Sequence, residues 1–348
     1  MKFFHNEFAF AEGEPPVVIA EAGVNHNGDV ALARRMIDAA VEAGADIVKF
    51  QAFKTEKEIS RFAMLAPYQQ ASSDAANQYD LCKALELPHS AFAELKDYST
   101  ERGIGFLCSA FDFDSIDFLV DDLKVEALKI ASGEITNFPL LDRIAQKGVG
   151  VILSTGGSTL AEIGEAVERL QRFGCPELAL LHCVSNYPAV HDQLNLKAVT
   201  TLAREFSLPT GFSDHSQGVE ASIAAVALGA RVIEKHFTLD RHLPGPDHLA
   251  SAEPDELHRL VAGVRLTQAS LGDGVKRAMP CELANVPLIR RSLVANGALK
   301  RGDRLTREMV DVKRPAEGID PRQIDEAIGR ELRRDLDYDQ PITWDDLV

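Results

Sequence analysis

The chain has 348 residues, of which 45% are hydrophobic and 26% are charged, so it can bury a large core and is neither fibrous nor disordered. Its 37 basic and 53 acidic residues give a formal net charge of −16, which disfavours binding to nucleic acid or to an anionic membrane surface. The length suits two domains, or one α/β barrel of about 250 residues with a small addition.

Short apolar runs rich in β-branched residues alternate with longer amphipathic runs from residue 17 to residue 271. Solidly apolar strands separated by helices are typical of a parallel sheet with both faces covered. The predicted strands are Val17–Gly23, Ile47–Gln51, Gly105–Ala110, Ala127–Ser132, Val151–Thr155, Leu178–Cys183, Thr210–His215 and Arg231–Thr238. The predicted helices are Val30–Ala43, His89–Arg102, Leu160–Phe173, Leu194–Phe206, Val219–Leu228 and Pro254–Leu271, with shorter periodic stretches in 111–126 and 133–150.

Eight strand–helix units of this kind predict a closed (β/α)8 TIM barrel, and an open doubly wound sheet is the alternative. Nearly every predicted strand ends in a polar residue. Because the carboxyl ends of barrel strands meet at one mouth, we expect these residues to ring a single site. They are Glu21, Lys49, Gln51, Ser109, Lys129, Ser132, Ser154, Thr155, His182, Ser185, Ser213, His215, Glu234 and His236.

The alternation stops after residue 271, so we predict a barrel domain over residues 1–271. Residues 272–290 contain Gly and Pro without a clear period and predict a linker, and residues 291–348 predict a small C-terminal domain. The segment 290–314 holds eight basic residues against three acidic ones. This positive segment is either a solvated surface or a group of cations that meets a polar ligand or the acidic barrel.

His215 and His236 end two neighbouring predicted strands, which lie about 4.8 Å apart in a sheet. Two imidazoles at matching heights can bind one divalent metal ion and leave positions open for water and substrate. For either histidine alone, a hydrogen bond to a backbone carbonyl is the alternative role. Glu21, Glu134 and Asp247 lie where a further ligand or an acid–base group can come from.

Lys49 and Lys129 end the second and fourth predicted strands, and the sequence shows no obvious carboxylate beside either lysine. Two cations combined with hydroxyl donors suit a phosphate or carboxylate ligand, and a Schiff-base lysine is the competing role. Glycines in the turns 132–134 and 155–158 let backbone N–H groups approach an oxyanion. The hydroxyl donors expected here are Ser132, Ser154, Ser185 and Ser213.

The five cysteines are scattered, odd in number and never spaced as C-x-x-C, which argues against a disulfide framework and a zinc knuckle. The first ten residues lack the unbroken apolar stretch of a secretion signal, and no apolar run approaches the about 18 residues of a membrane span. The sequence therefore predicts a cytoplasmic protein.

Taken in order, eight groups of residues resemble the sialic acid synthases, and the resemblance covers essentially the whole chain. They are AEAGVNHNGD (20–29), VKFQAFK (48–54), LKIASGEITNFPLL (128–141), ILSTGG (152–157), LLHCVSNYP (180–188), GFSDHSQG (211–218), ALGARVIEKHFTLDRHLPGPDH (227–248), and RRSLVA with VKRPAEGI (290–295 and 312–319). The resemblance implies a phosphoenolpyruvate-dependent barrel with a C-terminal antifreeze-like (SAF) domain. It also implies Mn²⁺ or Mg²⁺, and a homodimer whose SAF domain crosses to the partner's active site.

The resemblance also implies roles for matching residues. It makes His215 and His236 the metal ligands, and it makes Arg314 the arginine that reaches the N-acyl group from the neighbouring subunit. The phosphoenolpyruvate site would consist of Lys49, Lys129, Ser132, Ser154 and Ser213. The amino sugar would contact Glu21, Gln51, Tyr187 and Asp247. We add Glu134 and Ser185 to the expected substrate-binding residues, and we expect Glu21 to handle a proton near the sugar C1.

In the implied reaction, C3 of phosphoenolpyruvate attacks the metal-polarised C1 aldehyde of an open-chain N-acylmannosamine, water adds at C2, and phosphate leaves. The expected sugar is N-acetylmannosamine, which gives N-acetylneuraminate. The alternative is 2,4-diacetamido-2,4,6-trideoxymannose, which gives legionaminic acid. The segment 66–69 and the SGEITN stretch (132–137) resemble legionaminic acid synthases at least as much as neuraminic acid synthases. A metal-dependent TIM-barrel hydrolase and a non-catalytic sugar-binding protein are the alternatives from other classes.

Three positions depart from the sialic acid synthase pattern. Ser109-Ala110-Phe111 stands where these enzymes usually show Ser-Thr-Pro-Phe, so a hydroxyl on the phosphate side is expected to be missing at Ala110. Its loss would weaken phosphoenolpyruvate binding, or Ser109 would compensate. The second departure is Thr155-Gly156-Gly157 in place of Thr-Gly-Met, and the third is Ser185 in place of the Asn of some members.

Overall fold

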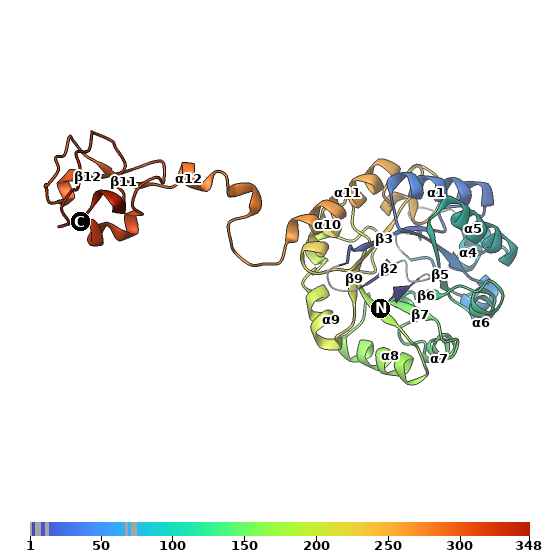
Figure 1. The fold of residues 1–348 in the computed structure, drawn as a ribbon. Coiled ribbons are helices and arrows are strands. Elements are labelled where there is room, and N and C mark those ends of the chain that lie inside the picture. The colour runs from blue at the N-terminus through green and yellow to red at the C-terminus, as the bar shows by residue number, and fades with distance from the viewer. Residues whose placement is uncertain (1, 4–7, 11–13, 67–68, 71–74) are drawn as a thin grey trace. The chain divides into compact units, whose positions relative to one another are not determined.

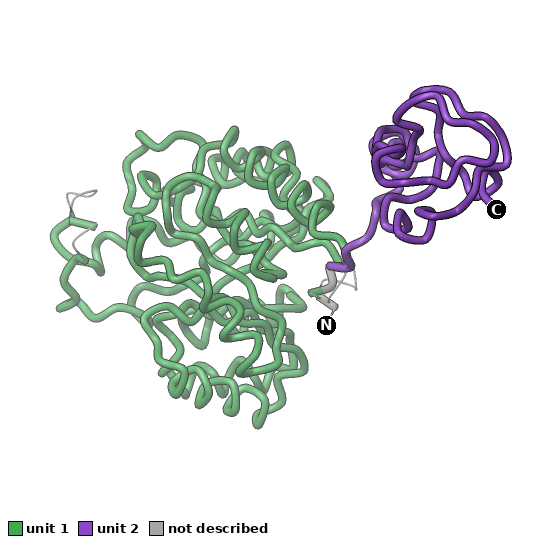
Figure 2. Tube along the Cα trace, turned by 90° about the vertical axis from the view of Figure 1, so that its left-hand side faces the viewer, with its two compact units in different colours: residues 1–272 green, residues 273–348 purple. Residues whose placement is uncertain are grey.

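The computed structural model describes residues 2–3, 8–10, 14–66, 69–70 and 75–348. The chain divides into two compact units, Met1–Gly272 and Asp273–Val348, which Figure 2 draws in different colours. Each unit has a hydrophobic core of its own. Within the described residues, no helix combines the length and the apolar character that crossing a membrane requires.

The first unit is a closed parallel barrel of eight strands, as the alternating pattern predicts. Pairing of the last strand with the first closes the sheet in the order β10-β3-β4-β5-β6-β7-β8-β9, which excludes the open sheet. The strands are β3 (Val17–Gly23), β4 (Ile47–Ala52), β5 (Gly105–Ala110), β6 (Ala127–Ile130), β7 (Gly150–Ser154), β8 (Leu178–Cys183), β9 (Thr210–Asp214) and β10 (Val232–His236).

Helices surround the strands as a ring in Figure 1. In the first unit they are α1 (Val30–Ala43), α2 (Thr55–Glu58), α4 (Gln78–Leu85), α5 (His89–Arg102), α6 (Phe113–Asp117), α7 (Phe138–Gln146), α8 (Leu160–Arg172), α9 (Ala198–Phe206), α10 (Glu220–Ala227) and α11 (Pro254–Leu271). Helix α1 illustrates how the sequence sets their ends. The Asp29 side chain accepts the Ala31 N–H at its start, and Gly44 ends it at φ 80°.

Apart from shifts of one or two residues at the ends of strands and helices, four features of the described first unit differ from the sequence prediction. Helix α9 begins at Ala198 and not at Leu194, because Asn195 adopts a left-handed backbone conformation with φ 47°. Helices α2 and α4 lie in a stretch without a predicted helix, and both are short. An N-terminal hairpin of β1 (Lys2–Phe3) and β2 (Phe8–Ala9) precedes the barrel and was likewise not predicted.

Alternation along the strands separates two layers of core. Outward-facing side chains such as Phe50 and Phe212 pack against the helices. Inward-facing apolar side chains fill the end of the barrel where the strands begin, and Phe10 packs among them. They are Val17, Ile19, Ile47, Leu107, Ala127, Ile152, Ala179, Leu181 and Val232. The next inward positions are polar, so the interior changes from apolar to charged toward the carboxyl ends of the strands.

The second unit contains a two-stranded antiparallel sheet of β11 (Ser292–Ala295) and β12 (Val310–Lys313). Its helices α12 (Val286–Ile289) and α13 (Ile324–Ala327) have one turn each. Its core consists of Leu293, Ala295, Leu299, Leu305, Ile319, Ala327, Leu332, Leu336, Ile342 and Leu347.

Candidate active site

Inward side chains of β3, β4, β6 and β10 form a buried cluster of alternating charge. Lys49 Nζ lies 3.3 Å from Glu21 Oε2 and 3.1 Å from Glu234 Oε2. Lys129 Nζ lies 3.7 Å from Glu234 Oε1. None of the four side chains is more than 4% exposed. This charge cluster (Glu21, Lys49, Lys129 and Glu234) therefore balances its own charges away from bulk water.

The charge cluster contains the carboxylate partners that were not obvious beside either lysine in the sequence. Barrel closure brings the partners together, because His236 is in register with Glu21 on one side of β3 and Glu21 is in register with Lys49 on the other. The sequence analysis placed Glu234 among the polar strand ends but gave it no role in the site. A role for Glu234 could have been inferred from its position two residues before His236, because this spacing puts both side chains on the same face of a strand.

Burial and neighbouring charge give the two carboxyl groups opposite properties. Burial raises the pKa of Glu21 to about 7, although Lys49 acts against the rise. Burial also disfavours the Glu234 carboxylate, but Lys129 and Lys49 outweigh it and lower the pKa of Glu234 to about 2. Glu234 is thus a fixed anion, whereas Glu21 can gain or lose a proton near neutral pH.

Hydrogen bonds fix the carboxylates and leave one hydroxyl available. Gln51 Nε2 donates to Glu21 Oε1 at 3.0 Å, and Ser213 Oγ donates to Glu234 Oε1 at 2.8 Å. Ser154 Oγ is buried and has no hydrogen-bond partner within the described structure. These contacts therefore gather predicted residues of β3, β4, β6, β9 and β10 in one place, as the strand-end pattern predicts.

Two further hydroxyls meet where the chain leaves β6 and β8. The Oγ atoms of Ser132 and Ser185 are 2.9 Å apart. A Cβ at Gly156 would lie 2.2 Å from Ser185 Oγ and 3.2 Å from Ser132 Oγ, so a side chain at this position would force the Ser185 side chain to shift. Glu134, at the end of the turn Ser132–Glu134, accepts a hydrogen bond from Asn137 Nδ2 at 2.7 Å.

His215 and His236 lie side by side, with ring centroids 5.6 Å apart. His215 Nδ1 donates to the Val184 carbonyl at 2.8 Å, so its Nε2 carries the lone pair. His236 Nδ1 is buried and has no hydrogen-bond partner among the described residues. Burial lowers the pKa of His215 to about 4, and burial together with His215 lowers the pKa of His236 well below its ordinary value. Both rings are neutral at neutral pH, as metal ligands must be.

Tyr187 and Asp247 flank the histidine pair. The Tyr187 ring lies 4.2 Å from the His215 ring and meets the His236 ring edge-on at 5.7 Å. Asp247 Oδ2 lies 4.0 Å from His236 Nδ1, and burial raises the pKa of Asp247 to about 6. In the part of the chain that the structure describes, no three His, Cys, Asp or Glu side chains could hold a metal ion among themselves.

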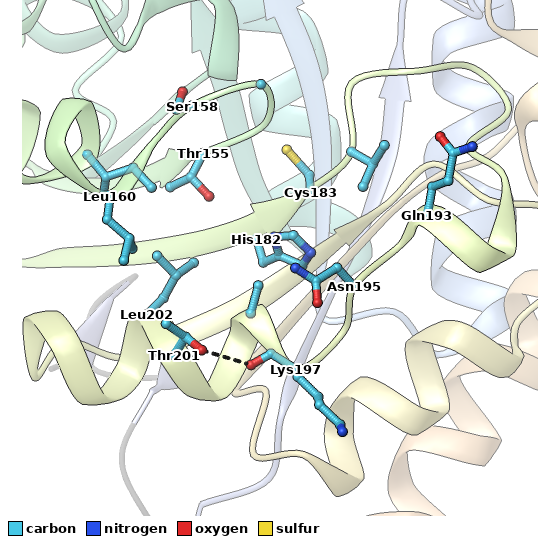
Figure 3. A pocket seen from close by; sticks show the side chains of 14 residues that line it. Thr155, Ser158, Leu160, His182, Cys183, Gln193, Asn195, Lys197, Thr201 and Leu202 are labelled. Carbon is cyan, nitrogen blue, oxygen red and sulfur yellow. Dashed lines mark hydrogen bonds between the residues drawn. The ribbon is translucent and has the colours of Figure 1, made fainter.

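Thr155 and His182 do not join this site, which corrects their inclusion among the strand ends. Both side chains point outward from the barrel, because they alternate with inward-facing neighbours along the chain at β7 and β8. Thr155 Oγ1 donates to the Leu181 carbonyl at 3.0 Å, and His182 Nε2 lies 2.7 Å from the Leu194 carbonyl oxygen. Both residues line a cavity of about 470 Å³ together with residues of α8 and α9. Figure 3 shows the side chains that line this cavity.

The presence of Ala110, where sialic acid synthases usually have Thr, removes no hydroxyl group from the barrel interior. Ala110 packs in the outer core layer with Cys108, whereas Ser109 faces inward and accepts a hydrogen bond from Lys49 Nζ at 3.3 Å. Two other predictions stay open. Pro67 and Tyr68 of the segment 66–69 lie outside the described residues. Arg314 is exposed in the second unit.

A closed (β/α)8 barrel with a buried charged centre at the carboxyl ends of its strands defines a TIM-barrel enzyme. The chain belongs to the NeuB family, whose model matches residues 36–276, and a SAF domain matches residues 290–348.

Known relatives cover nearly the whole chain. The chain is 44% identical over 329 residues to the N,N'-diacetyllegionaminic acid synthase of Campylobacter jejuni, covering 94% of this chain and 98% of the relative. It is 36% identical over 330 residues to the human N-acetylneuraminate-9-phosphate synthase, covering 94% and 91%. The crystal structure of N-acetylneuraminic acid synthetase from Leptospira borgpetersenii with citrate has 39% identity and a TM-score of 0.70, covering 78% of this chain and 90% of that one. These similarities confirm the predicted family and fold.

Proposed function

We propose that the protein condenses phosphoenolpyruvate and water with an N-acylated mannosamine-type sugar, forming a nine-carbon 2-keto sugar acid and phosphate. The observation that carries the proposal is the buried charge cluster beside two neutral imidazoles at one barrel mouth. Membership of the NeuB family supports the same class of reaction.

The cationic half of the charge cluster suits phosphoenolpyruvate. Lys49 and Lys129 offer ammonium groups to its phosphate and carboxylate oxygens, which form strong charge-assisted hydrogen bonds. Ser154 Oγ, buried without a partner in the described structure, is available to one of these oxygens. Glu234 keeps compensating charge beside both lysines. The remaining hydroxyls that would face the ligand are those of Ser132, Ser185 and Ser213.

The histidine pair suits a divalent cation, Mn²⁺ or Mg²⁺. His236 Nδ1 has no hydrogen-bond partner among the described residues, and His215 Nε2, which carries a lone pair, lies 3.3 Å from Ser213 Oγ. Neutral imidazole nitrogens are common metal ligands. When bound, the ion supplies Lewis-acid polarisation of the sugar's aldehyde oxygen. Asp247 and Tyr187 lie against the two rings, where they would hold the sugar hydroxyls.

The proposed chemistry forms one carbon–carbon bond and replaces the C2–oxygen bond to phosphate by a C2–oxygen bond to water. C3 of phosphoenolpyruvate bonds to the sugar's C1, the aldehyde oxygen takes a proton, water adds at C2, and phosphate leaves. Glu21, whose pKa is about 7 and which Gln51 orients, would deliver the proton to the C1 oxygen. Holding two reactants side by side can supply about 7–11 kcal/mol of the acceleration.

The preferred sugar follows from the relatives. The 44% identity to a diacetyllegionaminic acid synthase favours 2,4-diacetamido-2,4,6-trideoxymannose, which the sequence analysis had placed second. N-acetylmannosamine is the second candidate, supported by the 39% identity to the Leptospira synthetase. Domain exchange within a homodimer, with Arg314 reaching the N-acyl group, belongs to the same proposal.

Phosphate release from phosphoenolpyruvate tests the proposal directly. The full chain with Mn²⁺ is assayed with each of the two sugars and without sugar. We expect sugar-dependent release, faster with the diacetamido sugar, and a loss of at least 100-fold in Lys129→Met. Lys276→Met, which removes an exposed lysine, is the matched control. Absence of release with both sugars would contradict the proposal, and release without sugar would indicate a phosphatase.

A further inference from the structure

A second buried ion pair lies behind the histidine pair, on the outer face of the barrel wall. Lys235 Nζ lies 3.2 Å from Asp214 Oδ2, and neither side chain is more than 1% exposed. The two residues are directly opposite each other in the pairing of β9 with β10. Because side chains alternate along a strand, the neighbours on either side, including His236, face the interior.

Hydrogen bonds extend this ion pair into the loop that carries His215. Asp214 Oδ1 accepts the backbone N–H of Ser216 at 2.9 Å and its hydroxyl at 2.6 Å. Asp214 Oδ2 accepts the hydroxyl of Ser222, in the first turn of α10, at 2.6 Å. Lys235 Nζ donates to the Ser216 carbonyl at 2.5 Å. The residue after His215 is therefore held through its N–H, its carbonyl and its side chain.

Stability alone is a weak reason for this arrangement. Removing two charges from water costs several kcal/mol per ion, and an apolar pair of similar volume often gives equal or greater stability. The pair is instead suited to fixing geometry, because it fixes the register of β9 against β10 and the direction of the following loop. Those two elements carry His215 and His236, whose mutual distance determines how well both can bind one cation.

We propose that Asp214 and Lys235 are positioning residues that set the spacing of His215 and His236 and so the affinity of the divalent-cation site. The inference rests on the proposed function, since it assumes that the histidine pair binds a cation. It assigns no contact with substrate or metal to either residue.

Two measurements test the inference. Calorimetric titration of the metal-free full chain with Mn²⁺ gives the affinity of the cation site, and thermal unfolding in EDTA gives the stability of each variant. We expect Asp214→Asn to weaken Mn²⁺ binding at least tenfold. At saturating Mn²⁺ we expect kcat to fall more than the KM for phosphoenolpyruvate rises.

The matched control is Asp46→Asn. Asp46 immediately precedes β4, and Arg265 of α11 donates to both of its carboxylate oxygens at 2.6 Å. This ion pair lies at the amino end of the strands, away from the histidines, so its loss should lower Tm without changing Mn²⁺ affinity. Equal weakening in both variants would show that any loosening of the barrel has the same effect, and would overturn the inference.

A milder variant guards against loss of folding. Ser222→Ala removes one hydrogen bond to Asp214 and keeps both charges, and we expect it to weaken Mn²⁺ binding about threefold. Wild-type affinity in Asp214→Asn, or in Ser222→Ala if Asp214→Asn does not fold, would overturn the inference and leave the proposed function intact. Absence of Mn²⁺ binding by the wild type would overturn both.

Discussion

Glu234 Oε2 lies 3.1 Å from Lys49 Nζ, although 185 positions separate the two residues in the chain. The same carboxylate faces Lys129 through its other oxygen at 3.7 Å. One glutamate thus serves two buried ammonium groups on different strands, and the charge cluster depends on it.

Replacing Glu234 by Gln should destabilise the protein strongly. The substitution keeps the shape but leaves two buried lysines without their shared counter-charge, and breaking a buried pair in this way costs about 3–5 kcal/mol. Urea unfolding at pH 7 measures the loss. Glu165→Gln, which removes an exposed carboxylate on α8, should change the free energy of unfolding by no more than about 0.5 kcal/mol. Equal stability of the two variants would contradict the role of the charge cluster.

Replacing His236 by Ala should abolish Mn²⁺ binding and metal-dependent turnover while the fold persists, because one of the two imidazole ligands is lost. Calorimetric titration of the metal-free protein measures the effect. His182→Gln is a matched control, since His182 faces outward on β8 and bonds to the Leu194 carbonyl. Full activity of His236→Ala at saturating Mn²⁺ would refute the assignment.

Replacing Gly156 by Ala should raise the KM for phosphoenolpyruvate at least tenfold. The added methyl would meet Ser185 Oγ at 2.2 Å and Cys183 Sγ at 2.7 Å, so the Ser185 hydroxyl, which is expected to bind substrate, must shift. Steady-state kinetics with varied phosphoenolpyruvate measures it. Gly164→Ala on α8 has room for its methyl, with Phe206 the nearest group at 3.8 Å, and should leave KM unchanged. An unchanged KM in Gly156→Ala would show that this turn does not contact phosphoenolpyruvate.

His26 should make stability depend on pH. Burial lowers the pKa of His26 to about 4 from an ordinary value of 6.5, with Asp29 acting against the shift and His248 adding to it. Between these two values the unfolded chain binds a proton that the folded chain does not, so stability falls as the pH falls from 6.5 toward 4. Between pH 7.5 and pH 5 the wild type should lose about 2 kcal/mol more than His26→Gln. Urea unfolding at both pH values measures the difference, and parallel losses would contradict it.

Replacing Phe10 by Ala should destabilise the barrel by about 3–5 kcal/mol, because the ring packs on the inward apolar layer and is 2% exposed. Phe62→Ala removes a ring that is 94% exposed and should have little effect. Thermal and urea unfolding of the two variants provide the comparison. Equal stability would show that Phe10 does not contribute to the barrel core.

The sequence predicted the barrel because local patterns report burial well. The strand Gly105–Ala110 and the helix Pro254–Leu271 were predicted with the bounds that the structure has. Short elements were missed, because one turn of helix such as Thr55–Glu58 contains too few residues to show a period.

The sequence predicted which residues lie in the site better than it predicted which of them contact one another. Inward strand ends could be enumerated, but Thr155 and His182 were included because a strand end alone does not reveal which face a side chain takes. The pairing of Glu234 with Lys49 and Lys129 depends on closure of the sheet and on strand tilt, and neither property is local to any segment.

The apolar filling at the amino end of the barrel, with Phe10 among it, closes that end within the described residues, so reactants would enter from the carboxyl end of the strands. In the proposed reaction, phosphoenolpyruvate at the charge cluster and a sugar at the histidine pair would then pass through the same opening. Whichever of them occupies the inner position would have to bind first. The filled base of the barrel would thereby impose an order of binding that no residue of the charged centre dictates.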